Sequence, residues 1–298
     1  MSARPTYQFR GVYVASTMPF HADGSVDLDG FAKHCSWLAD AGVAGIVPNG
    51  SLGEYETLTD VERADVVKVA IESASGRIAV IPGVSAKSAP EARRWAEHAA
   101  SLGCPAVMAL PATSHAPTPE EVLAHFQEIA RVGLPIIAYN NPFSTRVDLV
   151  PELIARLAQI EQVVAVKEFS QDIRRVAAIH EGAPDIQILC GSDDTFVEAM
   201  FMGAVGWIAG FVNALPHHSV RLAQLCAARD FDAALPLYRV MLPLLRYDAD
   251  PRFVQAIKIA QDEVGRNVGG VRLPRLPLSA HDEARVRELT RRVVATAL

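Results

Sequence analysis

The sequence has no apolar run long enough to cross a membrane. Half of its 298 residues are hydrophobic, yet no run approaches the roughly 18 residues of a transmembrane helix. Met1 to Gly11 also has no apolar stretch of the kind that a secretory signal peptide contains. We therefore expect a protein without membrane contact.

Cysteines and metal-ligand motifs are scarce. The four cysteines are far apart, without a Cys-X-X-Cys pair, and we interpret them as buried, reduced thiols of a cytoplasmic protein. The histidines show no spacing typical of a metal site, so none is predicted. Lys and Arg are scattered and the formal net charge is -6, which argues against nucleic-acid binding.

Short apolar runs recur along the chain and predict buried strands. Their starts are 20 to 33 residues apart, enough for a strand, a helix and two loops. The runs are Val12–Pro19, Gly45–Pro48, Ile78–Gly83, Ala106–Leu110, Ile136–Asn140, Val163–Glu168, Ile186–Gly191 and Gly206–Ala209. Helix-start signals lie between them, such as Asp27, the Thr59–Glu62 capping box, Ser88 and Thr118.

Eight such units predict an α/β protein, either an open doubly wound sheet or a closed barrel. The first strand has no Gly-rich dinucleotide turn after it, which favours a (β/α)8 TIM barrel. After residue 229 only helical patterns follow, at Phe231–Leu245, Arg252–Val264 and His281–Ala297. We therefore predict a barrel domain over 1–229 and a C-terminal helical domain over 230–298.

Lys167 ends the apolar run Val163–Glu168. Lysine is rarely buried without compensation, and an apolar site disfavours its charged form. The neutral amine is a nucleophile towards carbonyl groups, so this lysine is a candidate catalytic residue. The alternative is that Lys167 reaches water or pairs with Glu168.

Active sites of such barrels lie at the carboxyl ends of the strands, and this rule selects further residues. Tyr139 ends the preceding strand and is a candidate proton shuttle. Gly50, Ser51 and Leu52 follow the second strand, where backbone N–H groups and a hydroxyl suit a carboxylate; Gly210 and Phe211 follow the eighth. Together they predict a pocket for a small carbonyl acid.

Each of these residues has an alternative role. Tyr139 could be a core aromatic residue whose hydroxyl is satisfied locally, and Gly50–Gly53 could be only a tight turn. For Gly191–Asp194 we favour a helix N-cap over a catalytic pair.

Four segments together resemble the dihydrodipicolinate synthase / N-acetylneuraminate lyase family of class I aldolases. They are the loop Gly50–Glu54, Tyr139–Pro142, Val166–Glu168, and Gly203–Gly206 with Asn213 and Pro216. The resemblance implies that Lys167 forms a Schiff base with a 2-oxo acid, that Tyr139 moves protons, and that Ser51 holds the carboxylate. It also implies a homo-oligomer, usually a tetramer but in some cases a dimer, with no metal and no organic cofactor.

The sequence departs from dihydrodipicolinate synthases proper at three places. Pro111–His115 contains no tyrosine where those enzymes have a second one, and Leu52 replaces a threonine of the carboxylate loop. Phe143-Ser144 stands where an arginine binds the second substrate, with Arg146 two residues further on. Ala112, Thr113, Ser144 and Phe211 are candidates for substrate selection.

The segments Glu168-Phe169, Phe253–Lys258 and Pro274–Leu278 are more similar to relatives that deaminate 1-pyrroline-4-hydroxy-2-carboxylate. The leading hypothesis is therefore a lyase that dehydrates, deaminates or cleaves a small 2-oxo acid or its cyclic imine. The alternatives are dihydrodipicolinate synthase proper, which condenses pyruvate with aspartate semialdehyde, and a non-catalytic barrel that binds a 2-oxo acid.

Overall fold

The eight predicted strands are all present in the computed structural model, which describes residues 7–297. The prediction that Met1 to Gly11 is no signal peptide lies largely outside that range. The strands are β1 (Gly11–Ala15), β2 (Gly45–Val47), β3 (Ala79–Val80), β4 (Val107–Ala109), β5 (Ile136–Asn140), β6 (Val163–Glu168), β7 (Gln187–Cys190) and β8 (Gly206–Ala209). They form one sheet in the order β3-β2-β1-β8-β7-β6-β5-β4.

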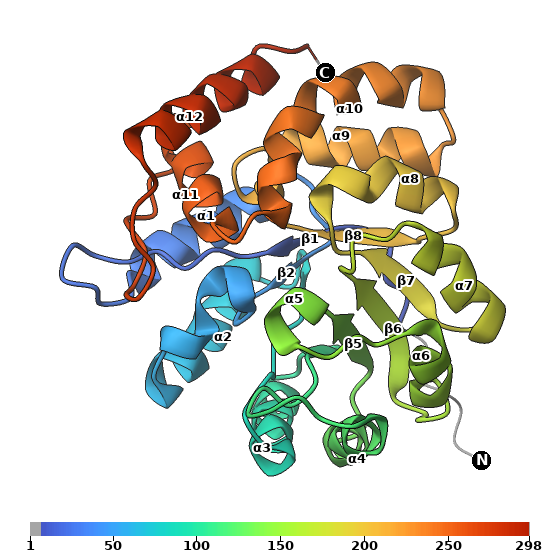
Figure 1. Cartoon of the computed structure of the whole chain (residues 1–298). Coiled ribbons are helices and arrows are strands. Elements are labelled where there is room, and N and C mark those ends of the chain that lie inside the picture. Colours follow the sequence, from blue (N-terminus) through green and yellow to red (C-terminus); the bar gives the residue numbers. More distant parts are fainter. Residues whose placement is uncertain (1–6, 298) are drawn as a thin grey trace. The chain divides into compact units, whose positions relative to one another are not determined.

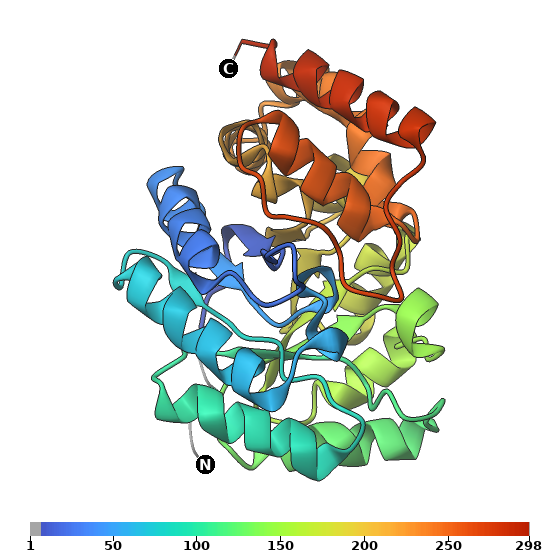
Figure 2. The ribbon, with the colours of Figure 1, turned by 90° about the vertical axis from the view of Figure 1, so that its left-hand side faces the viewer.

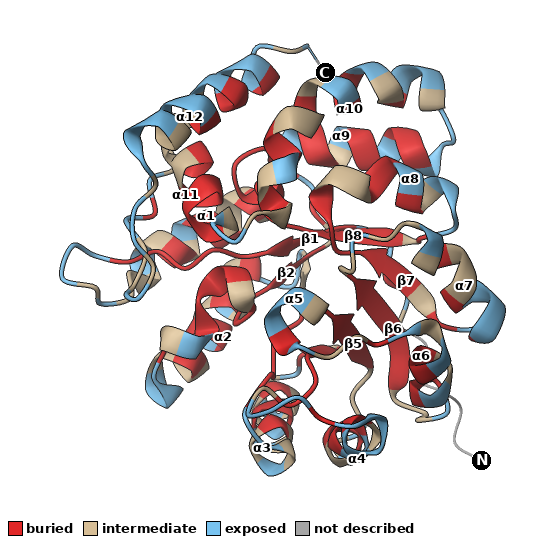
Figure 3. Ribbon diagram, viewed as in Figure 1, coloured by how far each residue is buried: buried red, intermediate tan, exposed pale blue. Residues whose placement is uncertain are grey.

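This order and the parallel pairings are those of a (β/α)8 fold. A parallel bridge joins Gly83, after β3, to Met108 of β4. The strands at the two ends of the order, β3 and β4, are therefore linked as well. Every residue of β5 and β6 is buried, which explains why both read as continuous apolar runs. Figure 3 shows these strands in red, with exposed residues on the surrounding helices.

By backbone contacts the chain divides into two units. Of the described residues, 7–10 and 80–207 form unit 1, and 11–79 and 208–297 form unit 2. The helices of unit 1 are α3 (Ala89–Ser101), α4 (Pro119–Ala130), α5 (Pro142–Thr145), α6 (Pro151–Leu157), α7 (Arg174–Gly182) and α8 (Phe196–Phe201). Those of unit 2 are α1 (Leu28–Asp40), α2 (Asp60–Ala74), α9 (Pro216–Ala227), α10 (Phe231–Leu245), α11 (Phe253–Glu263) and α12 (Ala280–Val294) (Figure 1).

The helix-start signals are confirmed as caps. The side chain of Asp27 accepts a hydrogen bond from the Gly30 amide at the start of α1. Thr59 and Thr118 each form a complete capping box, with Glu62 and Glu121 respectively. Such caps satisfy amides that have no partner inside the helix.

The C-terminal segment is helical as predicted, with the short 3-10 turn η5 (Arg246–Ala249) between α10 and α11. α12 packs against both α10 and α11. An irregular connection leaves α11 and returns to α12, drawn as the orange-red loop in Figure 2. The domain boundary at residue 229 stays a prediction. Among residues 7–297, no helix is long and apolar enough to cross a membrane.

The cysteine prediction is confirmed in part: all four side chains are buried and free. Burial raises the pKa of Cys35 to about 12 and that of Cys104 to about 11, so both thiols stay protonated at neutral pH.

Because two histidines are buried, we expect the protein to lose stability in acid. Burial lowers the pKa of His34 and of His125 from 6.5 to about 4 in each case. The unfolded chain therefore binds more protons between these values, and stability that is present above pH 6.5 falls as the pH drops towards 4. At about pH 4.5, each of these histidines should make the unfolding free energy about 2 kcal/mol lower than it is above pH 6.5.

Urea unfolding at about pH 7.5 and about pH 4.5 measures this effect. His34→Gln and His125→Gln should each shrink the difference between the two pH values by about 2 kcal/mol. An unchanged difference in both variants would mean that other groups cause the acid sensitivity.

Candidate active site

Lys167 and Tyr139 lie side by side at the carboxyl ends of β6 and β5. Their Cα atoms are partners in the parallel register, and the Lys167 Nζ lies 4.3 Å from the centroid of the Tyr139 ring. Each residue is 5% exposed. Among the described residues Lys167 has no ion-pair partner within 4 Å. The structure therefore brings together the two residues that end the fifth and sixth apolar runs.

Gly191 makes room for the lysine. A Cβ atom at this position would lie 2.7 Å from the Glu168 carbonyl oxygen and 3.0 Å from the Lys167 Cε. Because the nearest atom belongs to the backbone of β6, a side chain here would displace the strand that carries Lys167. The sequence contains Gly191 at the end of an apolar run, but its role depends on a contact between strands.

Glu168 makes hydrogen bonds on the opposite face of β6 and does not pair with Lys167. Successive strand residues point to opposite faces, so Glu168 meets Asn140, its register partner in β5. The Asn140 Nδ2 donates to Glu168 Oε2 over 3.0 Å, and the Ser170 amide donates to Oε1 over 2.6 Å. Burial raises the pKa of Glu168, while these hydrogen bonds oppose the shift. The carboxylate thus helps to hold β5 and β6 in register.

Asn141 satisfies the Tyr139 hydroxyl locally. The Asn141 Nδ2 lies 3.0 Å from the Tyr139 Oη, and the residue is also the N-cap of α5. Sequence reasoning placed Asn141 in the tyrosine motif without giving it a role. In this hydrogen bond the phenol oxygen is the acceptor, so the phenol proton can still be donated to another group.

In unit 2, the loop Gly50–Gly53 forms a tight turn. The turn is the 3-10 helix η1 (Ser51–Gly53), in which the Gly53 amide donates to the Gly50 carbonyl over 3.0 Å. Within residues 7–297, the amides of Ser51 and Leu52 have no backbone hydrogen bond. These are the amides that an anion could use. Leu52 buries its side chain, so any contact it makes with such an anion is through the backbone.

Gly210 and Phe211 also lie in unit 2, where β8 leads into η4 (Phe211–Asn213). The Asn213 Nδ2 donates to the carbonyls of Gly210 and Ala15, each over 2.7 Å, while its Oδ1 accepts from the Thr17 amide over 3.2 Å. Asn213 therefore fixes η4 against the end of β1. Phe211 has no exposed surface.

The N-cap interpretation of Gly191–Asp194 is confirmed only in position: Ser192 is the N-cap residue of the 3-10 turn that follows, but its side chain makes no capping bond. Neither η3 (Asp193–Thr195) nor α8 has a side-chain cap. The Asp193 Oδ1 instead accepts a hydrogen bond from the Trp207 Nε1 over 3.0 Å. Trp207 is fully buried, and a buried indole N–H needs an acceptor.

Glu54, at the end of the carboxylate-loop motif, is a buried structural residue. Its side chain is fully buried, and the Oε1 lies 2.8 Å from the Nζ of Lys258, which is 4% exposed. The same Nζ donates to the Gly270 carbonyl over 2.6 Å. Burial lowers the pKa of Lys258, and the Glu54 carboxylate opposes that shift. This pair ties the segment after η1 to α11.

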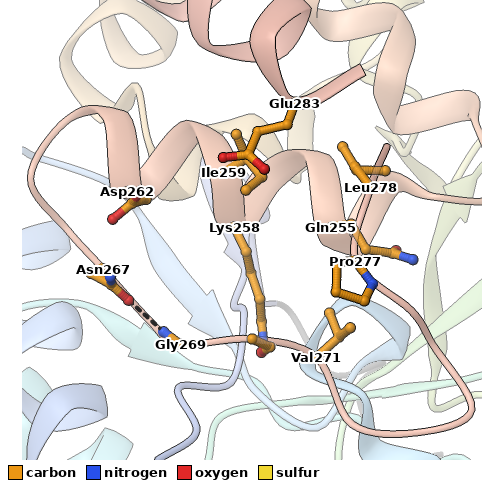
Figure 4. Close-up of a pocket in the computed structure, with 11 residues that line it drawn as sticks. Gln255, Lys258, Ile259, Asp262, Asn267, Gly269, Val271, Pro277, Leu278 and Glu283 are labelled. Atoms are coloured by element: carbon orange, nitrogen blue, oxygen red, sulfur yellow. Dashed lines mark hydrogen bonds between the residues drawn. The ribbon is translucent and has the colours of Figure 1, made fainter. Parts of the chain in front are cut away.

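Lys258 also lines a cavity of about 320 Å³ between α11, α12 and their connection. In Figure 4 the Lys258 side chain extends from α11 towards the connection near Gly269 and Val271, whereas Asp262 and Glu283 lie higher in the view, away from that connection. Both carboxylates bind Arg287 of α12. Two residues that line the cavity therefore also take part in ion pairs with α12.

Removing Lys258 should strongly destabilise the protein. Lys258→Met leaves the Glu54 carboxylate buried without its cation, which should lower the unfolding free energy by about 3–5 kcal/mol. Urea unfolding is the measurement. Lys258→Met combined with Glu54→Gln should lose less than Lys258→Met alone, because no buried charge is left unpaired. Equal losses would contradict this account.

The whole chain matches known proteins. The Dihydrodipicolinate synthetase family matches residues 8–292. A 4-hydroxy-tetrahydrodipicolinate synthase of Methanothrix thermoacetophila is 31% identical over 284 residues, covering 94% of this chain and 96% of the relative. One from Syntrophobacter fumaroxidans is 33% identical over 290 residues, covering 94% of this chain and 97% of the relative.

A solved structure agrees with the fold. The chloride-inhibited dihydrodipicolinate synthase from Acinetobacter baumannii, complexed with pyruvate, superimposes with a TM-score of 0.93 at 30% identity. The alignment covers 97% of this chain and 100% of that structure. With a family match over nearly the full length, this chain belongs to the dihydrodipicolinate synthetase family, whose members are class I aldolase-type lyases.

Proposed function

We propose that the protein is a Schiff-base lyase of a small 2-oxo acid or its cyclic imine, with Lys167 as the nucleophile. The observation that carries this proposal is the buried lysine without an ion pair, 4.3 Å from the ring of Tyr139. A lysine amine in such a site is suited to attack a carbonyl group.

In this mechanism the neutral amine of Lys167 adds to the 2-oxo group and forms a carbinolamine. Loss of water gives a protonated Schiff base, which withdraws electrons from the adjacent carbon and stabilises an enamine. Tyr139 gives and takes the protons of these steps. That the amides of Ser51 and Leu52 and the Ser51 hydroxyl bind the substrate carboxylate stays a prediction, as do substrate-binding roles for Gly50, Gly210 and Phe211.

The second candidate function is dihydrodipicolinate synthase proper. It is favoured by the names of the relatives, which are about one-third identical to this chain. It is disfavoured by the absence of tyrosine in Pro111–His115 and by Phe143-Ser144 in place of an arginine. Arg146 is exposed and ends α5 in a left-handed conformation, at φ 59°. We therefore prefer a single 2-oxo acid or imine as the substrate.

Substrate assays distinguish the two candidates. The protein is incubated with pyruvate plus aspartate semialdehyde and, separately, with 1-pyrroline-4-hydroxy-2-carboxylate and a series of 2-oxo acids. Release of ammonia or loss of water from a single substrate, with aspartate semialdehyde left unconsumed, supports the proposal. Rapid consumption of aspartate semialdehyde only with pyruvate present would identify the synthase instead.

A homotetramer or dimer and a cytoplasmic location remain predictions.

A further inference from the structure

Asn141 has a fixed amide orientation, because it caps α5. Its Oδ1 accepts a hydrogen bond from the Ser144 amide over 3.1 Å. An N-cap side chain needs an oxygen at this position, so the NH₂ group must point the other way. That group lies 3.0 Å from the Tyr139 Oη, and Asn141 is only 5% exposed.

This orientation determines where the Tyr139 proton points. An amide NH₂ group can only donate, so the phenol oxygen must accept and its own proton must be directed to another group. A donor at the phenol oxygen also stabilises the negative charge that remains when the proton leaves. Because Tyr139 is only 5% exposed, bulk water can contribute little to this stabilisation.

We infer that Asn141 is a positioning residue that aims the proton of Tyr139 at the reacting substrate and holds the phenolate that results. This inference rests on the proposed Schiff-base function. In the dehydration step the O–H bond of Tyr139 breaks and its proton joins the carbinolamine oxygen. The C–O bond breaks, water leaves, and the phenolate is balanced by the protonated Schiff base. The phenolate then takes a proton from the adjacent carbon to give the enamine.

Two substitutions preserve the helix cap and change only the contact with the phenol. Asn141→Ser keeps a capping hydroxyl that is too short to reach Tyr139, whereas Asn141→Asp puts an acceptor where the donor was. The probe is pyruvate, whose C3 protons exchange with D₂O when an enamine forms reversibly, followed by NMR. We expect the exchange rate at saturating pyruvate to fall about tenfold in Asn141→Ser and about a hundredfold in Asn141→Asp. The KM for pyruvate should change less than about threefold in both variants.

Two readouts separate positioning from a purely structural role. In a Tyr139→Phe background, neither Asn141 substitution should slow exchange further, because its target is gone. Asn141→Asp should also recover activity relative to wild type as the pH is lowered, because a protonated carboxyl can donate a hydrogen bond again. Thermal unfolding of each variant verifies that the fold is kept.

The inference is overturned if Asn141→Asp exchanges within twofold of wild type, or if its loss persists in the Tyr139→Phe background. Failure of the function itself gives a different result. In that case wild-type protein would neither exchange the pyruvate protons nor form a borohydride-reducible adduct, and the role of Asn141 would fall with it.

Discussion

Lys167→Met is expected to abolish exchange of the pyruvate C3 protons, with a loss of at least about 10⁴-fold. The reason is that the Schiff base is a covalent bond to the lysine amine. Among residues 7–297, Lys167 is the register partner of Tyr139 in β6, and no second amine stands at that position to replace it. Methionine has nearly the volume of lysine and leaves no polar group unpaired at the end of β6, so the fold should be retained. Exchange is followed by NMR and stability by urea unfolding.

The chain offers two matched controls for this variant. Lys87→Met removes an exposed lysine after β3 and should leave exchange and stability close to wild type. Lys258→Met removes the other buried lysine and should lower stability while leaving Schiff-base formation at Lys167 intact. Full exchange activity in Lys167→Met would exclude the proposed mechanism.

Tyr139→Phe is expected to have the second largest effect. The ring keeps its packing and its position beside the Lys167 Nζ, while the group that moves protons is lost. Exchange should slow by about 10²–10⁴-fold, the usual contribution of a positioned acid or base. Equilibrium binding of pyruvate, measured calorimetrically, should weaken far less than the rate falls. Equal losses in rate and binding would mean that Tyr139 only shapes the pocket.

The strands and the meeting of Lys167 with Tyr139 could be predicted from the sequence for a physical reason. A strand buried on both faces needs an unbroken apolar run, and parallel strands place their carboxyl ends together. A polar residue that ends such a run is therefore located by the pattern itself. The helix caps were equally predictable, because capping depends on residues only three positions apart.

Contacts that depend on side-chain direction could not be predicted in this way. The sequence shows Asn141 two residues after Tyr139, but its link to the phenol follows from the cap geometry of α5. The bond between Asp193 and the Trp207 indole joins two separate segments, and local pattern therefore suggested a cap instead. The pairing of Glu54 with Lys258 spans 204 positions of the sequence, and no periodicity indicates it.

The most direct test of the Schiff-base mechanism is to trap the adduct. The protein is treated with borohydride in the presence of pyruvate, and its intact mass and peptide masses are measured. The mechanism predicts one reduced pyruvyl group per chain, located on Lys167 among the five lysines of the sequence. No adduct, or an adduct on another lysine that persists in Lys167→Met, would contradict it.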